Sequence, residues 1–293
     1  SEEAEMEADV LRLIEARMSG FSKGQKLIGT YMLQHYEKAA YMTASRLGAT
    51  VGVSESTVVR FADELGFDGY PELQKSLQEL IRNKLTALQR IEVSDFRIGD
   101  GSVPEKILAS DMEKIRYTLE HLNGAAFEAT VDAIVHAKRI YIMGVRSSSA
   151  LASFLYFYFN MIFEDVKLLQ TTSRSEVFEQ IFRAKKGDLF IGISFPRYSK
   201  RVVAAMEYMQ AHGANTLAIT DNNASPLTEF ADYTLTAKSD MASFVDSLVA
   251  PLSLINALIA AVTRQKSDEV CSVFSTLEGM WDQFDVYEKK EDD

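Results

Sequence analysis

Residues 43–66 read TASRLGATVGVSESTVVRFADELG, and this stretch decides the fold of the N-terminal part of the chain. The pattern predicts a short helix over Met42–Leu47 and a second helix that Ser54 caps and that stops at Gly66. Gly52 allows a tight turn between the two helices. A helix-turn-helix needs a small residue where its helices approach, a turn, and polar residues early on the second helix, so this stretch predicts one.

The second helix has an apolar side and a polar side. Its predicted inward residues are Val53, Val58, Phe61 and Leu65. Its predicted outward residues are Ser54, Glu55, Ser56, Thr57 and Arg60. Arg60 suits guanine or a phosphate, and Ser56 and Thr57 suit base edges or phosphates. The alternative is a capped amphipathic helix in which Arg60 is solvated or paired with Glu64.

The rest of the N-terminal part also has helical periodicity, from Val10 to Leu80. Ser22 is a plausible N-cap, and Tyr70–Ile81 is predicted to be helical with Pro71 in its first position. Loop-forming residues such as Ser94-Asp95 and Gly99–Ser102 follow. We therefore expect a helix-turn-helix domain over residues 1–85, a linker over 86–105, and a second domain over 106–285.

The second domain alternates short β-rich runs with helical runs, which predicts βαβ units and a parallel sheet covered on both faces. The predicted strands are Arg139–Met143, Val166–Gln170, Asp188–Ser194, Asn215–Thr220 and Asp232–Leu235. Helices are predicted over Lys106–Leu122, Phe178–Ala184, Lys200–Gly213 and Ser243–Arg264. Ligands of such sheets bind at the carboxyl ends of the strands, so we expect binding in the loops after Met143, Ser194 and Thr220.

Composition narrows the class of protein. The 293 residues carry a net charge of −11, but Val10–Arg90 holds eleven basic against eight acidic residues, which is compatible with nucleic acid. No apolar run reaches the ~18–20 residues of a membrane span, and Ala150–Phe163 is expected to be a buried helix. Cys271 is the only cysteine, and histidine or carboxylate metal spacing is absent. No secretory signal pattern opens the chain, so a cytoplasmic protein without a membrane partner is expected.

The stretch TASRLGATVGVSESTVVRFADELGFDGYPELQKSL, together with FSKGQKLIGTYML before it, resembles the N-terminal module of the RpiR family of bacterial regulators. The resemblance covers roughly the first 80 residues and implies binding to double-stranded operator DNA. The candidate DNA-contacting residues are Lys23, Lys26, Thr43, Arg46, Ser54, Ser56, Thr57 and Arg60. Arg46 departs from the family, which often has an acidic residue there, and is either an extra phosphate contact or a surface charge.

The same family joins this module to a sugar-isomerase-type (SIS) domain, and Arg139–Arg264 resembles one. The resemblance implies a three-layer α/β domain whose five-stranded parallel sheet has flavodoxin-like order and whose Ser/Thr-rich loops bind phosphosugars. Three loops match: IYIMGVRSSSA, IGISFPRYSK and ITDNNASPLTEFAD. The resemblance implies binding roles for Ser148, Ser194 and Ser199, and the full set of candidate ligand-binding residues in these loops is Arg146, Ser147, Ser148, Ser194, Arg197, Ser199 and Thr220.

Two arginines depart from the family's loop pattern. Arg146 replaces a glycine of the first loop, and Pro196 and Arg197 replace a binding serine and a glycine of the second. Loss of those glycines prevents the usual close approach of the backbone to a phosphate. Two guanidiniums at adjacent strand ends suggest a charge-assisted grip on a phosphate or carboxylate instead. The alternative is that both arginines are rim residues paired with acids such as Glu176.

Catalytic residues are hard to find in the second domain. His136 and His212 are expected at the amino edge of the sheet, and a solvated helix face explains Glu176 and Glu179. We therefore expect a transcriptional regulator of carbohydrate metabolism that senses a small anionic sugar, with no cofactor and no catalysis. Lys106–Leu122 is either the element of a homodimer or homotetramer or a flank of the SIS core. The alternatives are a phosphosugar isomerase with a helical appendage and an SIS protein whose helical module binds no DNA.

Overall fold

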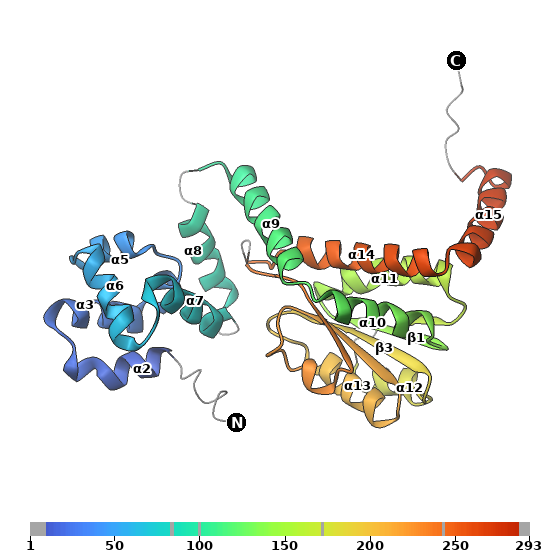
Figure 1. The fold of residues 1–293 in the computed structure, drawn as a ribbon, viewed down its shortest axis with the longest axis horizontal. Helices are drawn as coiled ribbons and strands as arrows, with labels where there is room; N and C mark the ends of the chain where they lie inside the picture. Colours follow the sequence, from blue (N-terminus) through green and yellow to red (C-terminus); the bar gives the residue numbers. More distant parts are fainter. Residues whose placement is uncertain (1–9, 83–84, 99–100, 171–172, 242–243, 287–293) are drawn as a thin grey trace, which may run out of the picture. The chain divides into compact units, whose positions relative to one another are not determined.

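The computed structural model of the chain describes residues 10–82, 85–98, 101–170, 173–241 and 244–286 (Figure 1). It divides into two compact units. The first comprises Ser1–Ile107 and Met241–Asp246, and the second comprises Leu108–Asp240 and Ser247–Asp293. None of the helices in these described ranges has both the length and the apolarity that crossing a bilayer requires.

The first unit is all-α, and its apolar side chains form one core. The helices are α2 (Val10–Arg17), the short 3-10 helix η1 (Met18–Gly20), α3 (Lys23–Gln34), α4 (Tyr36–Ala39), α5 (Ala44–Val51), α6 (Glu55–Leu65), α7 (Gly69–Arg82) and α8 (Ala87–Ile98). Ile28, Phe61 and Leu73 come from three different helices and are fully buried in this core. Ser22 caps α3 in a capping box with Gln25, as predicted.

The segment between Arg90 and Val103 differs from its prediction. We expected a linker over 86–105 because of its turn-forming residues, but α8 occupies Ala87–Ile98. Tertiary contacts override the local preference, since Val93 is buried in the core and Arg90 is 4% exposed. The Arg90 Nη1 atom lies 2.9 Å from Asp246 Oδ1, within the same unit.

The second unit is a three-layer α/β domain. Its strands are β1 (Arg139–Gly144), β2 (Val166–Leu168), β3 (Asp188–Ile193), β4 (Asn215–Thr220) and β5 (Tyr233–Thr236). Its helices are α9 (Val103–Glu120), α10 (Gly124–Val135), α11 (Ser148–Ile162), α12 (Arg174–Ile181), α13 (Lys200–Ala211), the 3-10 helix η2 (Thr228–Phe230), α14 (Val249–Gln265) and α15 (Ser267–Gln283). Only the first turn of α9 falls in the other unit.

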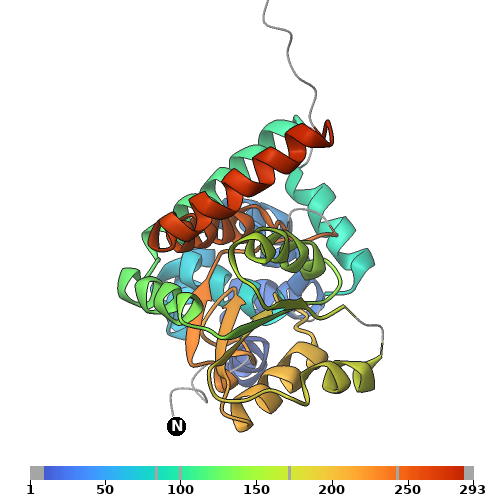
Figure 2. The same ribbon diagram turned by 90° about the vertical axis from the view of Figure 1, so that its right-hand side faces the viewer.

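The sheet has the order β2-β1-β3-β4-β5, and all of its pairings are parallel. This confirms the predicted five-stranded parallel sheet of flavodoxin-like order. Helices α10, α11 and α14 cover one face, and α12 and α13 cover the other (Figures 1 and 2). Side chains alternate along β1 between the two faces, with Ile140 and Ile142 on the α11 side and Tyr141 and Met143 on the α13 side.

Two helices of this unit were not predicted. Asn123-Gly124 was expected to end a helix, but the Asn123 side chain accepts a hydrogen bond from the Ala126 amide at 3.0 Å and begins α10. An Asn before a helical run suits an N-cap as well as a stop, so the local signal is ambiguous. The second, α15, lies in a segment that was assigned only to flanking helices.

Candidate functional sites

The α5–turn–α6 segment has the geometry of a helix-turn-helix. Gly52 ends α5 at φ +79°, a conformation that favours glycine. A Cβ on Gly48 would lie 2.8 Å from the Val53 carbonyl oxygen, so the close approach at the turn requires glycine at this position. Val58 and Phe61 on α6 are fully buried. The predicted inward side of α6 is therefore present.

The polar residues at the start of α6 form a cluster of hydroxyl groups on the surface. Ser54 Oγ lies 2.9 Å from Ser56 Oγ and 2.8 Å from Thr57 Oγ1. Ser54 occupies the N-cap position as predicted, but its side chain makes no capping hydrogen bond to the backbone. Arg60 is exposed, and its Nε donates to the Ser56 carbonyl at 3.3 Å. The hydroxyls and the guanidinium thus lie along the first two turns of one helix.

The N-terminus of α3 adds basic residues next to this cluster. Lys23 and Lys26 are exposed. A Cβ on Gly24 would lie 3.3 Å from Thr57 Cγ2, so the first turn of α3 packs on the first turn of α6. The side-chain amide of Gln25 donates to the carboxylate of Glu64 farther along α6. Two exposed lysines on α3 therefore lie on the helix that packs beside the hydroxyl cluster.

Thr43 and Arg46 lie at the start of α5. Thr43 caps that helix by accepting a hydrogen bond from the Arg46 amide at 3.2 Å. Arg46 is exposed. Burial raises the pKa of the Tyr31 phenol, Glu37 adds to the rise, and the charge of Arg46 opposes it. Arg46 therefore lies close to α3 as well as at the start of the first helix of the motif.

The loops expected to bind a ligand meet at one edge of the sheet. Gly144 at the end of β1 pairs with Ile193 at the end of β3, and Ile193 pairs with Ile219 in β4. Because the strands are parallel, the loops that follow β1, β3 and β4 leave from the same edge. The structure thus brings the loop residues of the three matching segments together.

Arg146 and Arg197 adopt the backbone conformation of glycine. Their φ angles are 59° and 64°, in the left-handed region that few non-glycine residues occupy. Both residues are exposed. Gly144, two residues before Arg146, is needed where it is, since a Cβ there would lie 2.3 Å from the Ser148 carbonyl oxygen. The loops keep the backbone shape of glycine-containing loops but carry a guanidinium at each turn.

The hydroxyl groups of these loops differ in their burial and in whether other groups of the protein already bind them. Ser148 is buried as the first residue of α11, and Ser147 before it is exposed. Ser194 Oγ accepts a hydrogen bond from the Ser199 amide at 3.0 Å, which closes the β3 loop. Thr220 is fully buried, and its Oγ1 lies 2.8 Å from Ser225 Oγ. The fold itself therefore engages the hydroxyls of Ser194 and Thr220.

A buried carboxylate at the same edge escaped the sequence analysis. Asp221 directly follows β4 and is 8% exposed. Its Oδ1 accepts a hydrogen bond from Tyr198 Oη at 2.7 Å, and its Oδ2 accepts one from Asn222 Nδ2 at 2.6 Å. Tyr198 is the neighbour of Arg197, so this bond ties the β3 loop to the β4 loop. An acid immediately after a predicted buried strand was the available signal.

The residues considered for catalysis lie elsewhere. His136 and His212 follow the last residues of α10 and α13, before β1 and β4 begin, and are therefore at the amino edge of the sheet. The Nδ1 atom of each lies 2.8 Å from a carbonyl oxygen one turn earlier in its own helix. Glu176 and Glu179 on α12 are not buried. Within the described ranges, no three His, Cys, Asp or Glu residues gather as a metal site.

Comparisons with known proteins match the two regions of the chain that hold these residues. Residues 8–84 match the model of the helix-turn-helix domain of the rpiR family, and residues 133–261 match that of the SIS domain. An uncharacterized HTH-type transcriptional regulator of Caldanaerobacter subterraneus is 26% identical over 272 residues, covering 89% of this chain and 93% of its own. The HTH-type transcriptional regulator HexR of Pseudomonas aeruginosa is 24% identical, covering 88% and 90%.

Solved structures that resemble the chain include the following two. The sugar isomerase domain of an RpiR transcription factor from Sphaerobacter thermophilus has a TM-score of 0.57 and 27% identity, and the match covers 60% of this chain and 97% of that one. NanR of Vibrio vulnificus, complexed with ManNAc-6P, has a TM-score of 0.57 and 20% identity, over 92% of this chain and 97% of that one. At that identity the likeness to NanR concerns the fold alone.

Proposed function

We propose that this chain, which belongs to the RpiR family by its helix-turn-helix and SIS domains, is a transcription regulator that binds operator DNA and senses an anionic sugar. The observation that carries the proposal is the pairing of two features. One is the exposed hydroxyl and guanidinium row on α6, and the other is the pair of left-handed arginines at the ligand edge of the sheet. Named relatives that span nearly the whole chain are transcription regulators.

DNA binding places α6 in the major groove. Arg60 contacts a guanine edge or a phosphate, with Ser56 and Thr57 beside it, while Lys23 and Lys26 neutralise phosphates on the α3 side. Ser54, Thr43 and Arg46 complete the contact at the ends of the two helices. Neutralised phosphates release counterions, so affinity for DNA falls steeply as salt rises.

Fluorescence anisotropy with the upstream region of the protein's own operon tests this part. Arg60→Ala should weaken binding about 10-fold or more, since a good base or phosphate contact contributes about 1–3 kcal/mol. Arg116→Ala is the matched control, because Arg116 is exposed on α9 and pairs with Glu113. Absence of binding at low salt, with or without candidate sugars, would contradict the proposal.

In ligand binding, the guanidinium groups of Arg146 and Arg197 make charge-assisted hydrogen bonds to the anionic group of the sugar. Each guanidinium offers five donors in a planar fork that fits a phosphate or a carboxylate. Ser147, Ser148 and Ser199 lie in the same loops and suit the remaining oxygens, whereas Ser194 and Thr220 shape the loops. The ManNAc-6P of NanR is an anionic sugar and supports the class of ligand.

Calorimetry with a panel of sugar phosphates and sugar acids tests this binding role of the two arginines. Arg197→Ala should lower affinity for the best ligand of the panel, and phosphates and carboxylates are compared directly in the same series. Equal affinity in Arg197→Ala would show that this arginine is a rim residue. No turnover is expected in a coupled isomerase assay, because the histidines lie at the amino edge and Glu176 is exposed on α12.

Regulation then follows from linkage between the two sites. A ligand that changes DNA affinity by some factor must have its own affinity changed by DNA by the same factor. A homodimer or homotetramer would present pairs of α6 helices, so we expect a palindromic operator with half-sites one or more helical turns apart.

A further inference from the structure

Helix α9 carries exposed large apolar side chains, although its buried side chains are polar. From Leu108 to Glu120 the buried side chains are Lys114 and Thr118, at 5% and 9% exposure. Leu108, Met112 and Leu119 are 63%, 62% and 71% exposed. A helix that packs on its own domain through apolar contacts shows the opposite arrangement. The apolar side of α9 is therefore built for contact with something outside its own domain.

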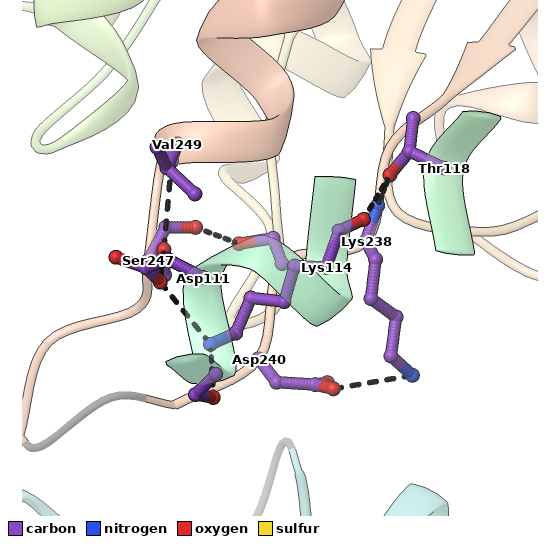
Figure 3. Close-up of polar contacts among 9 residues, drawn as sticks. Asp111, Lys114, Thr118, Lys238, Asp240, Ser247 and Val249 are labelled. Carbon is purple, nitrogen blue, oxygen red and sulfur yellow. Dashed lines mark hydrogen bonds and ion pairs between the residues drawn. The ribbon is translucent and has the colours of Figure 1, made fainter. Parts of the chain in front are cut away.

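Hydrogen bonds to its own domain hold α9 in this orientation (Figure 3). Lys114 Nζ lies 2.7 Å from Ser110 Oγ and 3.3 Å from Asp111 Oδ1. Asp111 Oδ1 also accepts from Ser247 Oγ at 2.6 Å, and Thr118 Oγ1 accepts from the Lys238 amide at 2.9 Å. Ser247 and Lys238 belong to the connection between β5 and α14. The Lys114 contacts lie within α9, whereas the bonds to Ser247 and Lys238 join α9 to this connection. Turning the apolar side inward would break those two bonds, so it stays exposed.

A second apolar stripe lies on α15. Val273, Met280 and Phe284 are 37%, 48% and 68% exposed, and Leu277 lies between them. The stripe has steps of 4, 3 and 4 residues, as does the stripe Leu108, Met112, Ile115 and Leu119 on α9. Such steps make the contact line of two packed helices. Both helices stand at the ends of α14, on its side away from the sheet (Figure 1).

The exposed area of the two stripes matches half of a stable interface. With about 180 Å² for the full surface of a large apolar residue, the exposed parts of the stripes amount to roughly 700 Å². A standard interface buries ~800 Å² on each partner.

We infer that these stripes pack against a second copy of this chain, with α9 of each copy on α15 of the other. A two-fold axis makes such a contact twice and covers all four stripes in one closed interface. Pairing α9 with α9 would cover one kind of stripe and leave α15 open. The inference rests on the self-association in the proposed function and assigns the surface that produces it.

Charge substitutions in the middle of the stripes test this assignment. Met112→Lys and Met280→Glu lie at inner positions of their stripes, so they meet when the two helices run antiparallel and lie about one helical turn apart when the helices run parallel. The wild type should sediment as a dimer at micromolar concentration, and each variant alone should be monomeric, with the dissociation constant raised about 100-fold or more because a charge is buried in an apolar contact. Glu120→Lys and Ser275→Glu, exposed positions off the stripes of the same helices, should remain dimeric.

Mixing the two variants distinguishes the pairing. If α9 packs on the partner's α15, a mixed dimer has one native contact and one Lys–Glu contact, so an affinity tag on one variant should retain the other. A monomeric wild type, dimeric stripe variants, or a mixture that stays monomeric would each overturn the assignment. Circular dichroism confirms that the variants are folded. Because mass is measured without DNA or sugar, failure here is separate from failure of operator or ligand binding.

Discussion

Replacing Arg146 or Arg197 by glycine should make the protein more stable and worse at binding its ligand. Each arginine holds a left-handed backbone, at φ 59° and 64°. That conformation costs about 1–2 kcal/mol for a residue with a Cβ. Glycine removes this cost, but it also increases the entropy of the unfolded chain, which offsets about 0.4–1 kcal/mol. The net expectation is a gain of roughly 0.5–1 kcal/mol for each substitution.

The effect on ligand affinity has the opposite sign. A hydrogen bond to a charged group contributes about 1.5–3 kcal/mol, so loss of one guanidinium should weaken anion binding about 10- to 100-fold. Stability and affinity therefore move in opposite directions if the arginines are kept for binding. This separation identifies strain that is maintained for function.

Urea unfolding and calorimetry measure the two quantities. Trp281 is the only tryptophan and lies on α15, so its fluorescence reports the second unit. Arg146→Ala and Arg197→Ala are the controls, because alanine removes the guanidinium and keeps the strained backbone; they should lose affinity without gaining stability. Glycine variants no more stable than the alanine variants would refute the strain argument. Unchanged affinity in all four would refute the binding role.

Three further substitutions test the fold around the sites. Gly48→Ala should destabilise the first unit by about 1–3 kcal/mol and weaken operator binding, because the new Cβ lies 2.8 Å from the Val53 carbonyl oxygen; thermal unfolding and anisotropy measure this. Gly144→Ala should lower the thermal midpoint of the second unit more strongly, because its Cβ lies 2.3 Å from the Ser148 carbonyl oxygen, and an unchanged midpoint would contradict the packing. Burial raises the pKa of Tyr70, so its contribution to stability is full below about pH 10 and is lost at higher pH as the unfolded phenol ionises. Tyr70→Phe should cost ~1 kcal/mol at pH 7 and remove this alkaline loss in melts across that range, and an equal loss in both proteins would assign it to other groups.

Several features followed from residue order alone. The alternation of large apolar residues along β1 and the spacing of the strand runs predicted the parallel sheet, because side chains in a strand point to opposite faces with a period of two. Ser54 and Gly66 likewise predicted the limits of α6, since N-cap positions and left-handed turns depend on neighbours only a few residues away, although the Ser54 side chain makes no capping hydrogen bond. These effects act between near neighbours in the chain and do not depend on contacts with distant segments.

Other features depended on contacts between distant segments. Helix α8 contains turn-forming residues and is helical because Val93 joins the core and Arg90 meets Asp246. The bond between Tyr198 and Asp221 joins two loops 23 residues apart. The sequence around one residue of such a pair does not identify the other residue as its partner.

The helix-turn-helix over residues 43–66 was thus determined by the sequence itself, through its three glycines and its apolar spacing. The tertiary structure alone decided that Arg146 and Arg197 adopt a left-handed conformation and that α9 turns its apolar side outward. The physical reason is the distance along the chain over which each effect acts. A residue's capping and turn preferences act over one helical turn, whereas its exposure and its partners depend on which distant segments pack beside it.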